Sequence, residues 1–369
     1  MSLSDTDAAV QNGVSRIETL RTLLAKHGAP GSRGCRQGAG DLTPIIRDGD
    51  VDVDVEPELV QVLGGEHELM LDLHPHLFPL ARSQSTGNYV CALRRAFAND
   101  ADYESSSMAP WPIVESKINA PGMRLLSLNS EHFMRRIACE ADDSGTGEEI
   151  VAIYNEGLGQ GKLPDAGLDE PYEPGSVAKL GYGVDKYALL RVGPFPDLYE
   201  SMALQHQAKG DESSSLIAAE TANGKFTGFG STFAFYAKLL STFPNRQEET
   251  KDAARVCLRI PIPSGGMEVE DLAQIARFAR LATEDDSPTE AIAKMAVMYE
   301  TIRQHEQDDD AANASKTPEQ NAIDEANFLL DSVALHGGRW SDIRSKLGII
   351  YHSAGRDDMA LFVDPGMKL

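Results

Sequence analysis

The back half of the chain, from Pro196 to Tyr351, carries helix signals arranged in pairs with short turns between them. Apolar residues recur at intervals of three and four, as in Phe233, Tyr236 and Leu240, and this spacing places one apolar stripe on one helical face. Because each helix must bury its stripe against another element, we expect antiparallel helical hairpins. No strong catalytic signature interrupts these helices, so the pattern favours a binding surface over a reaction centre.

Two helix starts in this half are specified residue by residue. Ser287–Glu290 and Thr317–Gln320 each begin with a hydroxyl residue followed by proline, and each ends with Glu or Gln. This is a capping box with proline at the first helical position, in which side chains satisfy backbone N–H groups that lack helical partners. Between these starts, residues 306–316 hold three consecutive aspartates and no apolar residue larger than alanine. We expect a solvated linker there.

The front half has a different pattern, with three short apolar runs bounded by turn residues at Tyr89–Leu93, Ile113–Ile118 and Met123–Leu128. Such runs predict strands, and a helix is expected to start at Asn129 or Ser130. Alternating Asp and Val over residues 48–55 predict an exposed strand. The fold class is therefore α+β and mostly α. The expected parts are an N-terminal helix (1–29), a small mixed α/β domain (30–160), a Gly/Pro-rich connector (161–196) and a helical hairpin-array domain (197–369).

The charge balance restricts the partners of this chain. Its 57 acidic and 34 basic residues give a net charge of −23, and the acids are spread along the whole length. Such a chain repels nucleic acid and anionic membrane surfaces. The same charge is explained either by solubility or by attraction to a basic protein partner. No window approaches 18 consecutive apolar residues, so no membrane insertion is expected.

The cysteines and the N-terminus bear on the compartment. Cys35, Cys91, Cys139 and Cys257 are far apart and form no C-x-x-C pair, which is typical of a reducing compartment. The first residues are acidic and lack an apolar run, unlike a signal or transit peptide. The sequence does not decide whether a targeting segment has been removed before them. We expect a soluble protein of the cytoplasm or of an organelle matrix, a plastid included.

A histidine cluster is the best candidate for metal binding. His74 and His76 flank Pro75, and His67 lies among acidic residues just before them. Two histidines at i and i+2 in an extended segment can point the same way and share a cation. Proline equally suggests a rigid turn in which the histidines are only polar. No other cofactor is expected.

A set of polar and aromatic residues around the stiff turn Gly193–Asp197 is the candidate lining of a cleft. Proline fixes φ in this turn and would hold Phe195 at the junction of the two halves. The candidates are Tyr182, Lys186, Tyr187, Arg191, Phe195 and His206.

Residues 198–261 resemble tetratricopeptide helical hairpins. A shift of 35 residues aligns Ala218-Ala219 with Ala253-Ala254, and Phe233 and Tyr236 supply the aromatic positions. The resemblance implies repeats that bury their faces by stacking on neighbours, while irregularly packed hairpins stay an alternative. The stretches 228–237 and 251–255 are also similar to uncharacterised plastid proteins of plants and algae, which implies no activity.

These patterns lead to two hypotheses from different classes. The first is an interaction or assembly factor, in the manner of a scaffold, that binds a protein partner through the hairpin surface. Phe229, Phe233 and Tyr236 are the candidate contact residues for that partner. The second is an enzyme with a metal-binding or small-molecule-binding cleft between the α/β half and the helical half, using the residues named above.

Overall fold

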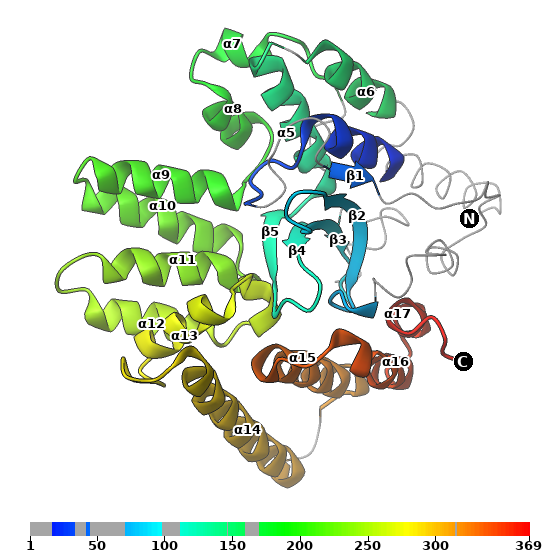
Figure 1. Ribbon diagram of the computed structural model, residues 1–369, viewed down its shortest axis with the longest axis vertical. Helices are drawn as coiled ribbons and strands as arrows, with labels where there is room; N and C mark the ends of the chain where they lie inside the picture. The colour runs from blue at the N-terminus through cyan, green and yellow to red at the C-terminus, as the bar shows by residue number, and fades with distance from the viewer. Residues whose placement is uncertain are drawn as a thin grey trace. The chain divides into compact units, whose positions relative to one another are not determined.

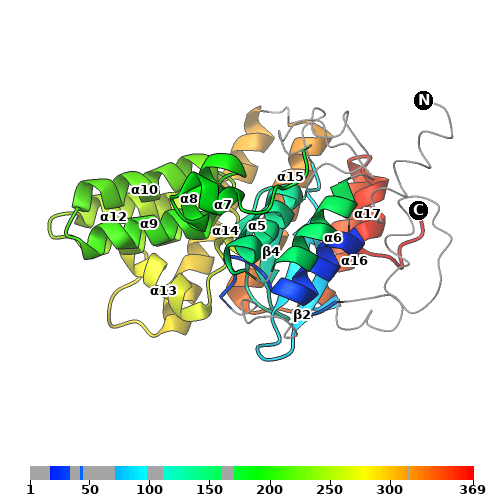
Figure 2. The same cartoon turned by 90° about the horizontal axis from the view of Figure 1, so that it is seen from above.

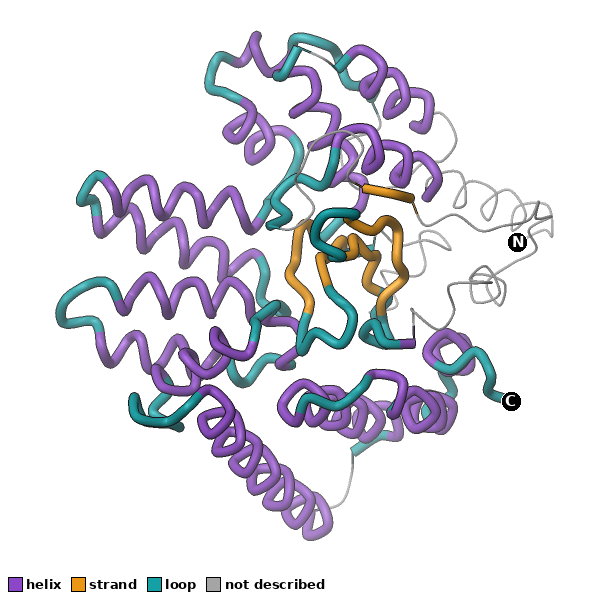
Figure 3. The backbone as a smooth tube through the Cα atoms, viewed as in Figure 1, coloured by secondary structure: helices purple, strands orange, loops and turns teal. Residues whose placement is uncertain are grey.

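The computed structural model describes residues 17–33, 42–44, 71–97, 111–145, 147–158, 170–313 and 316–369. Within these ranges the protein is mostly helical, with one small sheet (Figures 1 and 3), so the α+β prediction is confirmed. The chain divides into two compact units. The first takes the described residues up to Leu198, and the second takes the rest of the chain together with Leu71–Pro75 and Ile118–Arg124.

The sheet has its strands in sequence order, and each of the first four pairs with its neighbour in antiparallel fashion. The strands are β1 (Leu42–Pro44), β2 (Leu77–Ser83), β3 (Tyr89–Leu93), β4 (Ile113–Ser116) and β5 (Met123–Ser127). The predicted strands at β3, β4 and β5 are confirmed. Nearly every residue of β2, β3 and β4 is buried, which requires cover on both faces and removes the polar–apolar alternation of a half-exposed strand. β2 was missed because Pro79 interrupts it, and the pairing register shifts there.

The first unit also contains helices. They are a helix over residues 17–27, α5 (Ser130–Asp143), α6 (Glu148–Leu158), α7 (Ser176–Leu180) and α8 (Val184–Arg191). The side chain of Asn129 caps α5 by accepting the N–H groups of Glu131 and His132, as the predicted start requires. Residues 161–196 were expected to be a connector, but their described part contains α7 and α8. The second of these two helices, α8, ends at Arg191.

The second unit is built from successive helices that occupy the predicted hairpin positions. They are α9 (Pro196–Ala208), α10 (Glu212–Lys225), α11 (Gly230–Ser241), α12 (Gln247–Cys257), η1 (Ile262–Gly265), α13 (Val269–Phe278), α14 (Pro288–Asn313), α15 (Pro318–His336), η2 (Trp340–Asp342), α16 (Arg344–Ser353) and α17 (Asp357–Val363). α9 begins just before the division and continues into this unit. No described helix has both the length and the apolar character needed to cross a membrane.

Both predicted capping boxes are present. Thr317 and Gln320 exchange bonds at the start of α15, and Ser287 and Glu290 do so at the start of α14. The linker predicted at 306–316 is wrong, because α14 continues to Asn313. The stretch 305–313 contains no Gly, Pro or β-branched residue that would stop a helix.

Two short segments from the front half are held by the C-terminal helices. The guanidinium of Arg344 donates to the carbonyls of Leu71 and Leu73, and the indole N–H of Trp340 donates to the carbonyl of Ala120. The single front domain expected at 30–160 is therefore divided between the two units. The spacing of apolar residues within one element does not indicate bonds between residues more than 200 positions apart.

Candidate functional site

The helices α9–α13 form a stack in which side-chain bonds recur at nearly constant sequence separation. Gln207 bonds to Thr242 across 35 residues, and Arg246 bonds to Glu212 across 34. The first bond links the C-terminal ends of α9 and α11, and the second links the N-terminal ends of α10 and α12. These bonds bring the ends of α9 and α11, and those of α10 and α12, close together. α9 to α12 follow one another in a stack in Figure 1, and Figure 2 shows the same helices from above. This is the arrangement that stacked hairpins of about 35 residues produce.

Small side chains make the close packing of this stack possible. The buried positions on facing helices are largely alanines, and the hydroxyl of Ser215 on α10 donates to the carbonyl of Ala203 on α9 at 2.7 Å. Alanine loses almost no side-chain entropy in a helix and lets backbones approach each other. The buried alanines are Ala203, Ala218, Ala219, Ala222, Ala234, Ala237, Ala253, Ala254, Ala273 and Ala276.

The exposed side of the stack carries apolar residues that the fold itself does not bury. Ile217 on α10 is 62% exposed, and Leu204, Val256 and Val269 are also exposed. Ile217 on α10 and Val256 on α12 belong to helices whose N-terminal ends are joined by the bond between Arg246 and Glu212. Exposed apolar residues on neighbouring helices are the usual starting point of a protein interface.

The charge of the stack is close to neutral, unlike that of the whole chain. Residues 196–282 contain 11 acidic and 9 basic residues. Lys238 pairs with Asp271, Arg246 pairs with Glu249 as well as with Glu212, and Lys251 pairs with Glu248. The stack itself therefore gives no electrostatic preference for a basic partner, and the acidic excess lies elsewhere in the chain.

The three residues predicted to contact a partner have different surroundings. Phe229, just before α11, is buried, whereas Phe233 and Tyr236 are half-buried. The hydroxyl of Tyr236 donates to the exposed carboxylate of Glu220 at 2.6 Å, and burial is the main cause that raises the pKa of this tyrosine. Phe229 has little surface left to offer a partner, and the role of all three residues stays a prediction.

The structure describes two of the three predicted metal ligands. His67 lies outside the described residues. His74 is buried with its ring edge-on to Trp340 at 4.7 Å, and His76 is half-buried. In the ranges that the structure describes, no cluster of three or more His, Cys, Asp or Glu residues could hold a metal ion. Metal binding through this histidine set stays a prediction.

The residues predicted to line a cleft do not share one kind of environment. Tyr182, Lys186 and Arg191 are exposed on or beside α8, whereas Tyr187 and Phe195 are buried. His206, on α9, lies 3.5 Å from Asp211 in the turn before α10. Asp211 also accepts the N–H of Ser214 and so caps α10. The enzymatic hypothesis built on these residues stays untested.

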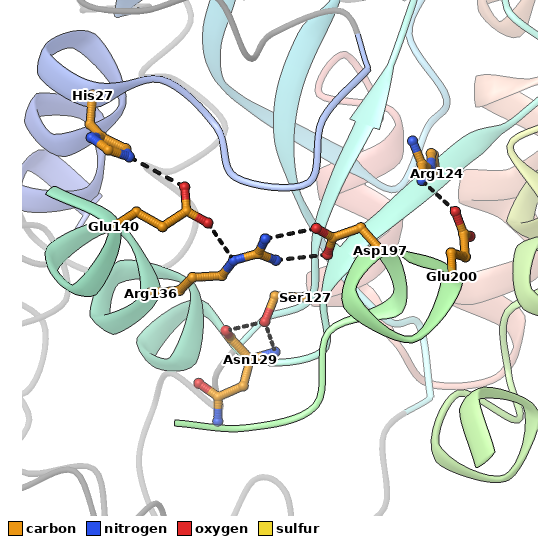
Figure 4. A network of polar contacts seen from close by, with 8 residues as sticks. All are labelled: His27, Arg124, Ser127, Asn129, Arg136, Glu140, Asp197 and Glu200. Atoms are coloured by element: carbon orange, nitrogen blue, oxygen red, sulfur yellow. Dashed lines mark hydrogen bonds and ion pairs between the residues drawn. The ribbon is translucent and has the colours of Figure 1, made fainter. Parts of the chain in front are cut away.

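A buried arginine in the first unit was missed at the sequence level. Both terminal nitrogens of Arg136 donate to the carboxylate of Asp197 at 2.7 Å, and its Nε donates to Glu140 at 2.9 Å (Figure 4). The guanidinium lies 4.7 Å from the ring centre of Phe195, and Glu140 also lies 3.5 Å from His27. Burial alone would lower the pKa of Arg136, but its two carboxylate partners raise it overall. In the sequence, only the i,i+4 spacing of Arg136 and Glu140 indicated part of this network.

Two further polar contacts belong to the second unit. Arg124, in β5, pairs with Glu200 of α9 at 2.9 Å (Figure 4). On α15, Asp331 accepts the N–H of Ile262 at the start of η1 at 2.7 Å. Burial raises the pKa of Asp331 to about 7, and the bond from Ile262 only partly offsets that effect. The carboxyl group of Asp331 therefore titrates near neutral pH.

Comparison with known proteins identifies the family to which this chain belongs. Residues 196–282 match the PAB middle domain, and residues 295–366 match the PAB C-terminal domain. The chain is 31% identical over 271 residues to an Arabidopsis thaliana protein named Protein IN CHLOROPLAST ATPASE BIOGENESIS, chloroplastic. That match covers 70% of this chain and 73% of the Arabidopsis protein. The chain belongs to the family of that protein.

The family assignment matches the architecture of the second unit. In this member of the IN CHLOROPLAST ATPASE BIOGENESIS family, the PAB middle domain coincides with the hairpin stack α9–α13. The PAB C-terminal domain takes in α15–α17 and most of α14. The resemblance to plastid proteins agrees with the chloroplastic relative, whereas the tetratricopeptide resemblance stays a prediction. No solved structure matches the chain significantly.

Proposed function

We propose that this protein is a plastid assembly factor that acts in the biogenesis of the chloroplast ATPase. The observation that carries the proposal is the match to the Arabidopsis protein, which extends over about seven tenths of both chains. A relationship of that extent includes more than one isolated domain, so a shared role is a reasonable inference. The PAB middle and C-terminal domains account for much of the second unit.

The surface that we assign to this role is the exposed face of α10 and α12. It offers Ile217 and Val256 between polar and charged neighbours, and neither residue is needed to fill the core of the stack. An assembly factor must bind a subunit and later release it, which favours a mixed apolar and polar surface over a fully apolar one. We place Phe233 and Tyr236 at the edge of this surface as additional contacts.

Complementation tests the proposal in a living plant. The chain, carrying a chloroplast targeting sequence, is expressed in Arabidopsis plants that lack the related protein, and assembled ATPase is measured on native gels. We expect the amount of assembled ATPase to rise toward that of normal plants. An unchanged ATPase level, with the expressed chain present in the chloroplast at normal abundance, would show that the chain does not perform this role.

Surface variants then test which face is used. Ile217→Asp with Val256→Asp places two charges on the proposed surface, and Ile349→Asp on α16 changes an equally exposed residue, 61% accessible, away from the stack. All three positions are exposed, so the folded protein should tolerate each change. We expect the double variant to lose complementation and binding to purified ATPase subunits, while Ile349→Asp retains both. Equal behaviour of the two proteins would reject this surface.

A further inference from the structure

The turn that joins α7 to α8 presents one tyrosine to solvent. Gly181 ends α7 with φ 76°, and Gly183 begins α8 with φ 82°, conformations that residues with a Cβ rarely adopt. No atom lies within 4 Å of the position that a Cβ would take at either glycine, so the turn stands clear of its surroundings. Tyr182 lies between them and is 65% exposed. α7 and α8 follow each other directly in Figure 1.

One side of α8 is anchored and the opposite side is free. Tyr187 is buried on the anchored side, with its ring edge-on to Tyr172 at 6.3 Å. Lys186 and Leu190 lie four residues apart in α8 and therefore share the free side, and Tyr182 lies in the turn just before the helix. Leu190 is 64% exposed, and the ammonium of Lys186 lies 5.2 Å from the ring centre of Tyr182. We call these three residues the α8 ridge.

The stretch of chain that carries the α8 ridge contains more basic than acidic residues, and Glu173 and Asp197 flank it on either side. Residues 174–196 contain three basic residues and one acidic residue, whereas the whole chain carries a net charge of −23. The three bases are Lys179, Lys186 and Arg191, all exposed, and none forms an ion pair with a residue that the structure describes. Their charge is therefore available to a ligand.

We propose that the α8 ridge docks an acidic, amphipathic segment of a protein partner. Tyr182 and Leu190 provide the apolar contacts. Tyrosine is one of the side chains that most often contribute a large share of the binding energy at protein interfaces. Lys186, with Lys179 and Arg191 beside it, pairs with carboxylates of the segment and selects against basic ones. The net negative charge of the whole chain opposes every anionic ligand, and it opposes nucleic acid and anionic membranes more strongly because they carry far more negative charge than a short peptide segment. This surface is distinct from the hairpin stack and does not rest on the role proposed for that stack.

Selection from a random peptide library tests the proposal, because the selection requires no assumption about which protein the partner is. Displayed 16-residue peptides are enriched on the immobilised full chain, and enriched sequences are resynthesised and titrated by fluorescence anisotropy. The proteins compared are the unmodified chain, Tyr182→Ser with Leu190→Ser, Lys186→Glu, and Ile349→Ser as the matched exposed control. Circular dichroism checks that each variant keeps its helical content. Vesicles with and without phosphatidylglycerol serve as the lipid probe.

The expected result is enrichment of peptides with net negative charge and at least one large apolar residue. Their affinity should fall about tenfold in the double variant, which corresponds to the loss of one strong contact, and should be unchanged in Ile349→Ser. Lys186→Glu should weaken the binding of the same peptides, and added salt should reduce the effect of that substitution on affinity. The proposal is overturned if no peptide is enriched or if the enriched peptides are neutral or basic. It is also overturned if the peptides bind the double variant and the unmodified chain with equal affinity. Binding to phosphatidylglycerol vesicles that depends on the α8 ridge overturns it in favour of a lipid surface.

Discussion

Replacing Asp331 by Asn should stabilise the protein by an amount that depends on pH. Asn keeps an oxygen that can accept the N–H of Ile262, so the 2.7 Å bond at the start of η1 is preserved. The substitution removes the carboxylate that burial disfavours. Tyr299 on α14 is the other titratable group that faces this position, and burial also raises its pKa. Tyr299 therefore stays neutral over the pH range in which Asp331 titrates.

The magnitude follows from the shifted pKa. The carboxyl group of Asp331 has a pKa of about 7 in the folded protein and about 3.9 in an unfolded chain. Because the folded pKa is raised, the contribution of this group to stability is present below pH 4 and lost as pH rises to 7. At about 1.4 kcal/mol per pH unit, the loss at pH 8 amounts to about 4 kcal/mol, compared with about 1.5 kcal/mol at pH 5.

Urea unfolding at the two pH values measures this difference. Trp340, in the second unit, reports the transition by fluorescence when Trp111 is replaced by Phe in every protein compared. We expect the gain in unfolding free energy from Asp331→Asn to be about 3 kcal/mol larger at pH 8 than at pH 5. Asp252→Asn, at an exposed aspartate of α12, should show no such dependence. The reasoning is refuted if Asp331→Asn changes stability equally at both values, or lowers it at pH 8.

Further substitutions test other parts of the fold by urea unfolding. Arg136→Met should cost about 3–5 kcal/mol, because it removes the partner of the partly buried carboxylates of Asp197 and Glu140. Adding Asp197→Asn should recover part of that loss, and a fully additive double variant would contradict the pairing. Gly266→Ala should destabilise by more than about 2 kcal/mol, because its φ is 56° and a Cβ would lie 2.8 Å from the backbone of β5. Gly355→Ala, with φ 74° and open space around it, should cost only about 1 kcal/mol, and equal losses would remove the steric argument. Arg344→Met should cost about 3 kcal/mol by removing the donor to three carbonyls, with an unchanged midpoint as the contrary result.

The helices of the second unit were largely predictable because their signals are local. A capping box such as Thr317–Gln320 is complete within four residues, and an apolar stripe such as that of α11 is complete within three turns. Helix formation depends on neighbours within four positions, so a short window of sequence contains most of the information. The continuation of α14 through residues 306–313 was missed because acidic composition was interpreted as a linker, although no helix-breaking residue is present.

The short elements of the first unit were predicted less completely for a related reason. β2 is buried on both faces and contains Pro79, so it lacks the alternation by which a half-exposed strand is recognised. α7 has only five residues and is enclosed by glycines, a composition that is more typical of a loop. Two residues of the α8 ridge, Tyr182 and Lys186, were predicted to line a cleft together with Tyr187, but the sequence did not indicate that Tyr187 would be buried.

The amino-acid sequence by itself determined the mostly helical class and the start points of the capped helices. Both rest on contacts between residues close in the chain or on simple periodicity. Only the tertiary structure decided that Asp331 meets Ile262 across 69 residues and that Arg344 holds Leu73 across 271. The physical reason is that a buried charge gains its partners from whichever backbone groups the packed helices bring close. A local pattern does not encode that pairing.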